Sequence, residues 1–229
     1  MLVVQWLGSI DYQQAWDLQV RLADEIARHV SPPTLLLLEH PHTYTFGRSG
    51  HAENLLWSEA ELERRGVQVH WVDRGGDITY HGPGQLVGYP LLPLAPPNWN
   101  TTSKGHLPQA DYVGYLRRLE KALIETLAEL GLPGCQALEG LTGVWVPGSP
   151  LPAKIAAIGV KVDARGISRH GFALNVRTDM EYWQGIVGCG LAGYPVANLS
   201  DYVQPAPGMP TVVEAASNAF RRAFNTGFG

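Results

Sequence analysis

Four stretches of the chain repeat apolar residues at the spacing of an α-helix. In the first, Ala15, Leu18, Leu22 and Ile26 recur at three- and four-residue steps, which predicts an amphipathic helix. The other predicted helices run from a capping box at Ser58–Glu61 to Gly66, along the apolar stripe Val113–Leu130, and from a capping box at Thr211–Glu214 to Phe224.

Short runs rich in β-branched and aromatic residues predict strands between these helices. They lie at Val3–Leu7, Thr34–Glu39, Val67–Val72, Leu86–Leu92, Val144–Pro147, Ile155–Val162 and Gly171–Val176. Helices and strands do not alternate regularly, which favours a mixed sheet with packed helices over a doubly wound parallel sheet. We therefore expect an α/β fold of the α+β type in one domain over residues 1–229, with a smaller C-terminal subdomain from about residue 143 as the alternative. Pro93–Gly105, rich in Pro and small polar residues, is the one clear predicted loop.

Composition and charge narrow the class of protein. The chain is 45% hydrophobic and 17% charged, which suits a folded domain with a substantial core. Its 17 Lys and Arg against 21 Asp and Glu give a net charge of -4, so we expect no nucleic-acid partner. Two cysteines, Cys135 and Cys189, are too few for a disulfide framework and favour a cytoplasmic setting. Met1–Leu7 reads as a first strand and not as a signal peptide, and no apolar run is long enough to span a membrane.

The segment Arg74–Gln85 contains the densest group of candidate binding residues. Among its twelve residues are four glycines and one proline. Glycines allow backbone amides to approach a ligand closely, and Arg74, Thr79, His81 and Gln85 add side-chain hydrogen-bonding groups. A tight turn capped by polar residues is the ordinary alternative, but the concentration of polar groups favours a binding loop.

Nucleotide and metal sites have little support in the sequence. The chain contains no Gly-x-x-x-x-Gly-Lys-Ser/Thr motif, and no Gly-x-Gly-x-x-Gly follows a strand and opens a helix. His40 and His42 place two imidazoles close together, but no cysteine cluster or Glu-bearing helical motif completes a metal site. We expect no cofactor and no metal.

A second group of reactive residue types spans Lys154–Cys189. Lys154 opens an apolar run, and Cys189 stands between two glycines that would leave its sulfur uncrowded. Taken alone, a cysteine is more often a small buried apolar residue and a lysine a solvated charge. A catalytic cysteine would need a partner that lowers the pKa of its thiol, and both interpretations stay open at this level.

The segment Arg74–Tyr89 resembles the signature of the lipoyl(octanoyl) transferase family. Further blocks that resemble this family, in the same order, are Thr142–Trp145, Lys154–Gly159, His170–Asn175 and Cys189–Gly190. The similarity covers nearly the whole chain. The Pro-rich connection Val146–Ala153 departs from the pattern and affects the expected loop geometry, and Cys135 matches no block and is interpreted as structural.

The resemblance implies a fold of the biotin/lipoate protein ligase type and an octanoyltransferase activity. If the family's catalytic residues are assigned to the matching positions of this chain, Cys189 would accept the acyl group and Lys154 would be its acid/base partner. The implied substrate-binding residues are Arg74, Gly75, Gly76, Asp77, Ile78, Thr79, Tyr80, His81, Ala157, Ile158, Gly159, Gly171, Phe172 and Ala173. For His81 three roles stay open: orienting the substrate, packing against the acyl chain, or completing a hydrogen-bond network.

The resemblance also implies the partners. The donor would be octanoyl-acyl carrier protein, and the acceptors would be lipoyl domains of 2-oxoacid dehydrogenase E2 subunits and the glycine cleavage H protein. A thioester donor is already activated, which agrees with the missing nucleotide motifs. The candidate basic residues for docking an acidic carrier are Arg64–Arg65, Arg117–Lys121 and Arg165–Arg169. The protein is expected to be a monomer.

Three rival functions remain. An ATP-dependent ligase on the same fold would need a nucleotide loop and no nucleophilic cysteine. A lipoyl-domain amidotransferase would keep the cysteine and is harder to separate by sequence. A non-catalytic carrier-binding module would have no reason to retain both Lys154 and Cys189.

Overall fold

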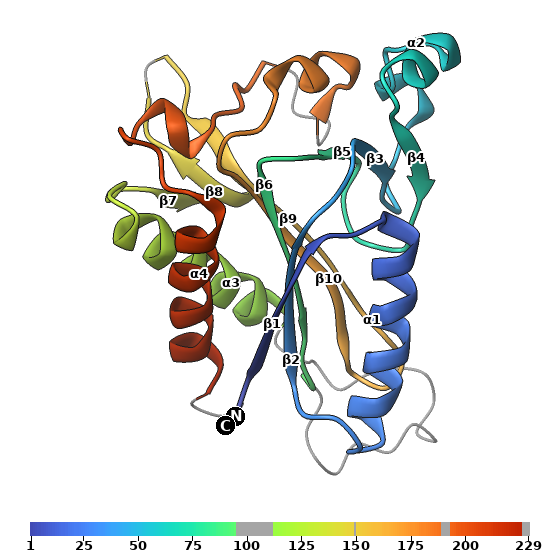
Figure 1. Ribbon diagram of the computed structural model, residues 1–229, viewed down its shortest axis with the longest axis vertical. Coiled ribbons are helices and arrows are strands. Elements are labelled where there is room, and N and C mark those ends of the chain that lie inside the picture. The colour runs from blue at the N-terminus through green and yellow to red at the C-terminus, as the bar shows by residue number, and fades with distance from the viewer. Residues whose placement is uncertain (95–111, 149, 189–192, 226–229) are drawn as a thin grey trace.

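A seven-stranded mixed sheet runs through the centre of the molecule (Figure 1). The computed structural model describes residues 1–94, 112–148, 150–188 and 193–225. In spatial order the strands are β1 (Val3–Ser9), β2 (Thr34–Glu39), β6 (Gln85–Leu91), β10 (Ser168–Asn175), β9 (Ala153–Val162), β8 (Leu141–Val146) and β7 (Gln136–Leu138). The pair β1–β2 is parallel and the other neighbours are antiparallel. Strands from both sides of residue 143 share this sheet.

Helices cover both faces of the sheet (Figure 1). Helix α1 (Tyr12–Ala27) packs on one face, and α3 (Tyr112–Glu129) and α4 (Met209–Phe224) pack on the other. Because successive side chains of a strand point to opposite faces, Leu35 and Leu37 join the core under α3 and α4, whereas Leu36 and Leu38 join the core under α1. None of the helices within the described ranges is long and apolar enough to cross a membrane.

A smaller sheet stands beside the upper end of the large one (Figure 1). It consists of β4 (Gln68–Trp71), β3 (Thr43–Phe46) and β5 (Ile78–His81), in that order, and the short helix α2 (Glu59–Arg64) packs nearby. The loop between β4 and β5 reaches the large sheet, where the N–H of Gly75 donates to the carbonyl of Val160 at 3.0 Å. A Cβ on Gly47 would lie 2.2 Å from the carbonyl oxygen of Gly76, so only glycine fits there.

All four predicted helices and all seven predicted strands are present, with shifts at their ends. Helix α4 begins at Met209 after Gly208, and not at Thr211, because Pro210 is well suited to the first turn. Strands β3, β5 and β7 were not predicted. Short 3-10 helices lie at Ala52–Asn54, Met180–Gly185 and Leu199–Asp201. The predicted loop Pro93–Gly105 falls outside the described residues after Leu94.

Candidate active site

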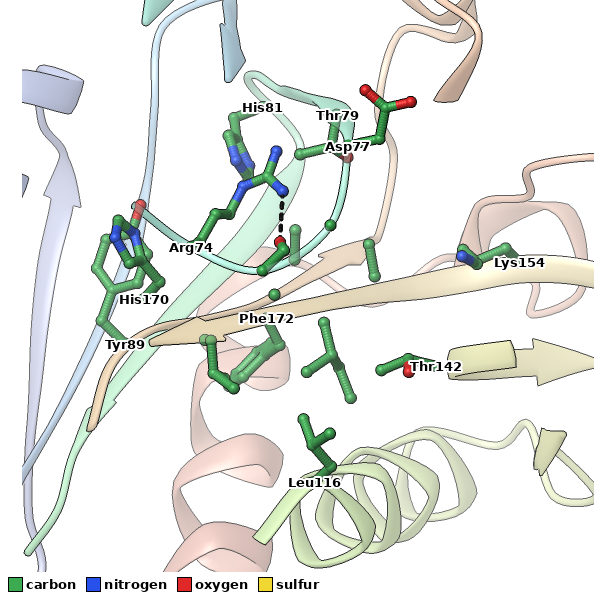
Figure 2. A pocket seen from close by; sticks show the side chains of 18 of the residues that line it. Arg74, Asp77, Thr79, His81, Tyr89, Leu116, Thr142, Lys154, His170 and Phe172 are labelled. Carbon is green, nitrogen blue, oxygen red and sulfur yellow. Dashed lines mark hydrogen bonds between the residues drawn. The ribbon is translucent and has the colours of Figure 1, made fainter. Parts of the chain in front are cut away.

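A cavity of about 390 Å³ lies against β9 and β10 (Figure 2). It is found where the loop between β4 and β5 (residues 72–77, here called the glycine-rich loop) meets the large sheet. Small residues leave room in this part of the sheet: Ala157 pairs with Ala173, and Gly159 pairs with Gly171. The predicted substrate-binding residues that line the cavity are Arg74, Gly75, Gly76, Asp77, Thr79, His81, Ala157, Ile158, Gly159, Gly171, Phe172 and Ala173. The side chains of Arg74 and His81 lie on one side of the two strands and that of Phe172 on the other.

Ile78 and Tyr80 are the two predicted substrate-binding residues that do not line the cavity. They belong to β5, whose side chains alternate, so that Thr79 and His81 face the cavity while Ile78 and Tyr80 face the core of the small sheet. Both side chains are fully buried there beside Tyr44. In this structure the side chains of Ile78 and Tyr80 therefore pack in that core and not against the cavity.

Arg74 holds the glycine-rich loop against β3. Its guanidinium donates to the backbone carbonyl of Thr45 at 2.5 Å, to the Thr45 hydroxyl at 2.9 Å and to the Gly75 carbonyl at 2.9 Å. Only 7% of the residue is exposed. A planar donor fork of this kind fixes several acceptors at once, so Arg74 sets the shape of the loop as well as lining the cavity.

His81 is a neutral imidazole in a closed hydrogen-bond network. The amide nitrogen of Gln85 donates to the Tyr80 carbonyl and to Asn175 Oδ1, so its Oε1 accepts from His81 Nδ1 at 2.9 Å. Nε2 then accepts from the Thr45 hydroxyl at 3.4 Å. Burial is the main reason that the pKa of His81 lies well below 6.5. Of the three roles left open for His81, the network role is the one these contacts describe.

Asp77 is engaged with backbone and amide donors. Its carboxylate accepts from the N–H of Ile78 at 2.7 Å, from the N–H of His51 at 3.1 Å and from the side-chain amide of Asn54. These bonds tie the glycine-rich loop to the segment after β3. Thr79 differs, because its buried hydroxyl has no hydrogen-bond partner within the described residues and is available to a bound ligand.

Tyr12, Tyr89 and His170 line the cavity but were not among the predicted site residues. Figure 2 places Tyr89 and His170 at the end of the cavity away from Lys154. His170 Nε2 donates to Asp73 at 2.8 Å, and its backbone has a φ of 55°, which is uncommon for a residue other than glycine. Both Tyr89 and His170 stand within the family-like blocks of the sequence, whereas no pattern singles out Tyr12 in α1.

A β-bulge turns Lys154 toward the cavity. Val144 pairs with Ala156 but the next residue, Trp145, pairs with Lys154, so Ile155 is an extra residue in β9. Paired residues share a face of a sheet, and the bulge therefore places Lys154 on the face of Trp145 and not on that of Val144. Lys154 is 7% exposed, and its Nζ lies 4.7 Å from the centroid of the Trp145 ring.

Cys189 lies outside the described residues, and its position is not given. The chain that follows can be placed: Lys154 N–H donates to the Pro195 carbonyl at 2.8 Å, and Ala197 N–H donates to the Lys154 carbonyl at 3.0 Å. Residues 195–197 therefore run beside Lys154. The other cysteine, Cys135, is buried, and burial raises the pKa of its thiol to about 11. Within the described ranges no group of three or more His, Cys, Asp or Glu residues could hold a metal ion.

Comparisons with solved structures define the class to which this fold belongs. A lipoate-protein ligase A bound with ATP superposes with a TM-score of 0.67 at 17% identity, over 98% of this chain and 85% of that one. A bi-partite lipoate protein ligase from Thermoplasma acidophilum superposes with a TM-score of 0.68 at 18% identity, over 100% of this chain and 84% of that one. The fold is that of the lipoate ligases, as expected.

Sequence similarity is much closer. Residues 11–221 match the model of the lipoyl protein ligase A/B catalytic domain. An octanoyltransferase of Acidobacterium capsulatum is 46% identical over 95% of this chain and 88% of its own length. An octanoyltransferase of Chloroflexus aurantiacus is 44% identical over 93% of this chain and 89% of its own length. The chain belongs to the lipoyl protein ligase A/B catalytic-domain family, among its octanoyltransferases, which confirms the resemblance and the enzyme class predicted from the sequence.

Proposed function

We propose that this enzyme moves an octanoyl group from acyl carrier protein to a lysine of a lipoyl domain, through a thioester on Cys189. The position of Lys154 supports this proposal most directly. Its side chain is buried, and a β-bulge turns it into a partly apolar cavity. Residues 195–197, which follow Cys189 in the chain, run beside it. A cation near a thiol favours the thiolate, which is the nucleophilic form.

Each half-reaction needs one proton transfer. In the first, the Cys189 thiolate attacks the thioester carbonyl carbon, the bond to the carrier sulfur breaks, and the carrier thiolate takes a proton from the Lys154 ammonium. In the second, the neutral amine of the acceptor lysine attacks the Cys189 thioester. An amide forms, Cys189 leaves as thiolate, and the Lys154 amine takes the proton lost by the amide nitrogen. The enzyme returns to its starting state without ATP.

The cavity is suited to an eight-carbon chain. Each buried methylene contributes about 0.8 kcal/mol, so a chain of this length gains most of its binding energy from burial. Ala157 and Ala173 offer an apolar surface on the face of β9 and β10 that also carries Gly159 and Gly171. The chain is proposed to lie over these residues, with its thioester at the Lys154 end.

The partners follow from the same proposal. Octanoyl-acyl carrier protein is the donor, and lipoyl domains of 2-oxoacid dehydrogenase E2 subunits and of the glycine cleavage H protein are the acceptors. The Thermoplasma acidophilum ligase, which shares this fold, was analysed together with its E2 lipoyl domain. That domain is an example of the proposed class of acceptor. A monomeric, cytoplasmic enzyme is part of the proposal.

The basic groups expected to dock the carrier are engaged within the protein. Their ion pairs join Arg64 and Arg65 to Glu61, Arg117 to Glu120, Lys121 to Glu125, Arg165 to Asp24 and Asp163, and Arg169 to Asp73. Arg64, Arg117 and Lys121 nevertheless stay half or more exposed, and exposed ion pairs are weak, so the three patches remain predictions.

The test is to incubate the purified enzyme with octanoyl-carrier protein in the absence of ATP and to measure the intact mass, followed by peptide mapping. We expect one octanoyl adduct on Cys189, absent from Cys189→Ala and retained in Cys135→Ala, the matched cysteine control. Octanoylation of Cys189→Ala would overturn the nucleophile assignment. Acylation of a lipoyl domain only with ATP and free octanoate would favour the ligase, and acylation only from an octanoylated lipoyl domain would favour the amidotransferase.

A further inference from the structure

The environment of Lys154 is unusual for a buried ammonium group. Lysine is seldom buried without a carboxylate partner. Within the described part of the chain, however, no carboxylate oxygen lies within 4 Å of Lys154 Nζ. The contact that the structure does show is with the face of the Trp145 indole, whose centroid is 4.7 Å from Nζ. An ammonium group at this distance is attracted to the negative face of the ring.

The indole is held rigidly in place. Trp145 is fully buried, its Nε1–H donates to the Leu141 carbonyl at 3.2 Å, and Tyr194 packs edge-to-face against it at a centroid distance of 5.3 Å. The residue does not line the cavity, so it is not placed to touch the acyl chain. Within the described residues it meets the cavity lining at Lys154 and, through its Nε1–H, at the Leu141 carbonyl.

An aromatic face suits a lysine that must both release and accept a proton. A carboxylate beside Nζ would stabilise the ammonium form strongly and compete with the thiolate for it. The indole has no proton acceptor, so it attracts the ammonium group without taking its proton and without forming an ion pair. It also restricts a flexible side chain that has four rotatable bonds.

We propose that Trp145 is a positioning residue that holds the Lys154 ammonium group in the active site through a cation–π contact. This inference rests on the proposed function, in which Lys154 is the acid/base group. The β-bulge at Ile155 brings Trp145 and Lys154 opposite each other, so the bulge and the indole together set the position of the Lys154 side chain.

The experiment is stepwise fluorination of the indole at position 145, by site-specific incorporation of mono-, di- and trifluorotryptophan. Fluorine weakens the negative face of the ring and changes its size little. We expect the rate of octanoyl-enzyme formation to fall stepwise, by about 3- to 30-fold over the series, with little change in KM for the carrier substrate. Fluorine makes Nε1–H a better donor, so weakening of the Leu141 hydrogen bond cannot explain such a fall.

The same series at Trp71 is the control, because this residue is 59% exposed on β4 and packs on Phe46. It should leave the rate unchanged. Among ordinary substitutions, Trp145→Phe should keep more activity than Trp145→Leu, since Phe retains a weaker aromatic face. A rate that does not respond to fluorination at Trp145 would overturn the inference, as would a Leu variant equal to the Phe variant.

A second measurement separates this inference from the proposed function. Ring currents should shift the ε-methylene protons of Lys154 upfield in the NMR spectrum of the unmodified enzyme, and Trp145→Leu should remove the shift. If the unmodified enzyme forms no octanoyl adduct but shows the upfield shift, the proposed function fails and the contact stands. Ordinary shifts for these protons would overturn the contact whatever the activity.

Discussion

Gln85 donates a 2.9 Å hydrogen bond from Nε2 to Oδ1 of Asn175, joining the glycine-rich block to the last residue of β10 inside the sheet. The network continues in both directions. On one side Gln85 accepts from His81, and on the other Asn175 donates to the Ala197 carbonyl at 3.2 Å. Since Ala197 N–H in turn donates to the Lys154 carbonyl, hydrogen bonds connect both ends of the candidate site.

Replacing Gln85 with Leu should therefore destabilise the protein. The substitution leaves His81 Nδ1 and Asn175 Oδ1 without their partner in a buried setting, and a buried polar group that loses its partner costs about 1–3 kcal/mol. Urea unfolding should show a lower free energy of unfolding than the wild type. Gln13→Leu is the control, because Gln13 lies on the exposed face of α1; an equal loss in both variants would contradict the network.

The sequence singled out the segment Arg74–His81 but not the way its side chains point. The block Arg74–His81 was identified by its glycines and polar residues, yet β5 was missed because the flanking glycines hide a four-residue strand. Without β5, the alternation that turns Ile78 and Tyr80 away from the cavity could not be predicted.

The bulge in β9 was also beyond prediction. Regular alternation along β9 would place Lys154 on the face of Ala156, and only the pairing with β8 shows the extra residue. Bulges depend on the partner strand, whereas hydrophobic periodicity describes one strand at a time. Tyr12 was missed for a related reason, because it reaches the cavity from a helix distant in sequence.

Stability should fall as the pH is lowered below about 6.5, because buried imidazoles resist protonation. Burial lowers the pKa of His40 from 6.5 to about 4, and it is also the main cause of the lowered pKa of His81 and His170. The unfolded chain thus binds more protons than the folded one in this window, so the free energy of unfolding decreases with decreasing pH. For His40 alone the loss by about pH 4 is about 3 kcal/mol.

Urea unfolding at several pH values between about 7.5 and about 4.5 would measure this dependence. The matched variant is His40→Gln, whose amide can still donate to the Ile10 carbonyl and accept from the Tyr89 hydroxyl. It should show a smaller decrease with acid, since one titrating group is gone. An unchanged free energy of unfolding across the range would contradict the burial of neutral imidazoles.

Arg74→Lys should lower both stability and activity although it keeps the positive charge. An ammonium group cannot reproduce the fork that binds the Thr45 carbonyl, the Thr45 hydroxyl and the Gly75 carbonyl together. We expect a loss of about 1–3 kcal/mol in the free energy of unfolding, with slower octanoyl-enzyme formation because the loop is less well held. Arg28→Lys, on the exposed end of α1, is the control. Wild-type stability and rate in Arg74→Lys would show that charge alone is required.

Ala157→Leu should shorten the acyl chain that the enzyme accepts. Ala157 lines the cavity opposite Ala173, and three added carbons there would displace part of an octanoyl chain. Losing the burial of two or three methylenes costs about 2 kcal/mol, which is a decrease of about 30-fold for the octanoyl donor. Butanoyl-carrier protein, which does not reach as far, should be affected little. Acyl-enzyme formation from four-, six- and eight-carbon donors, followed by intact mass, gives the ratio directly. An equal decrease for all three donors would mean that Ala157 does not contact the distal part of the chain.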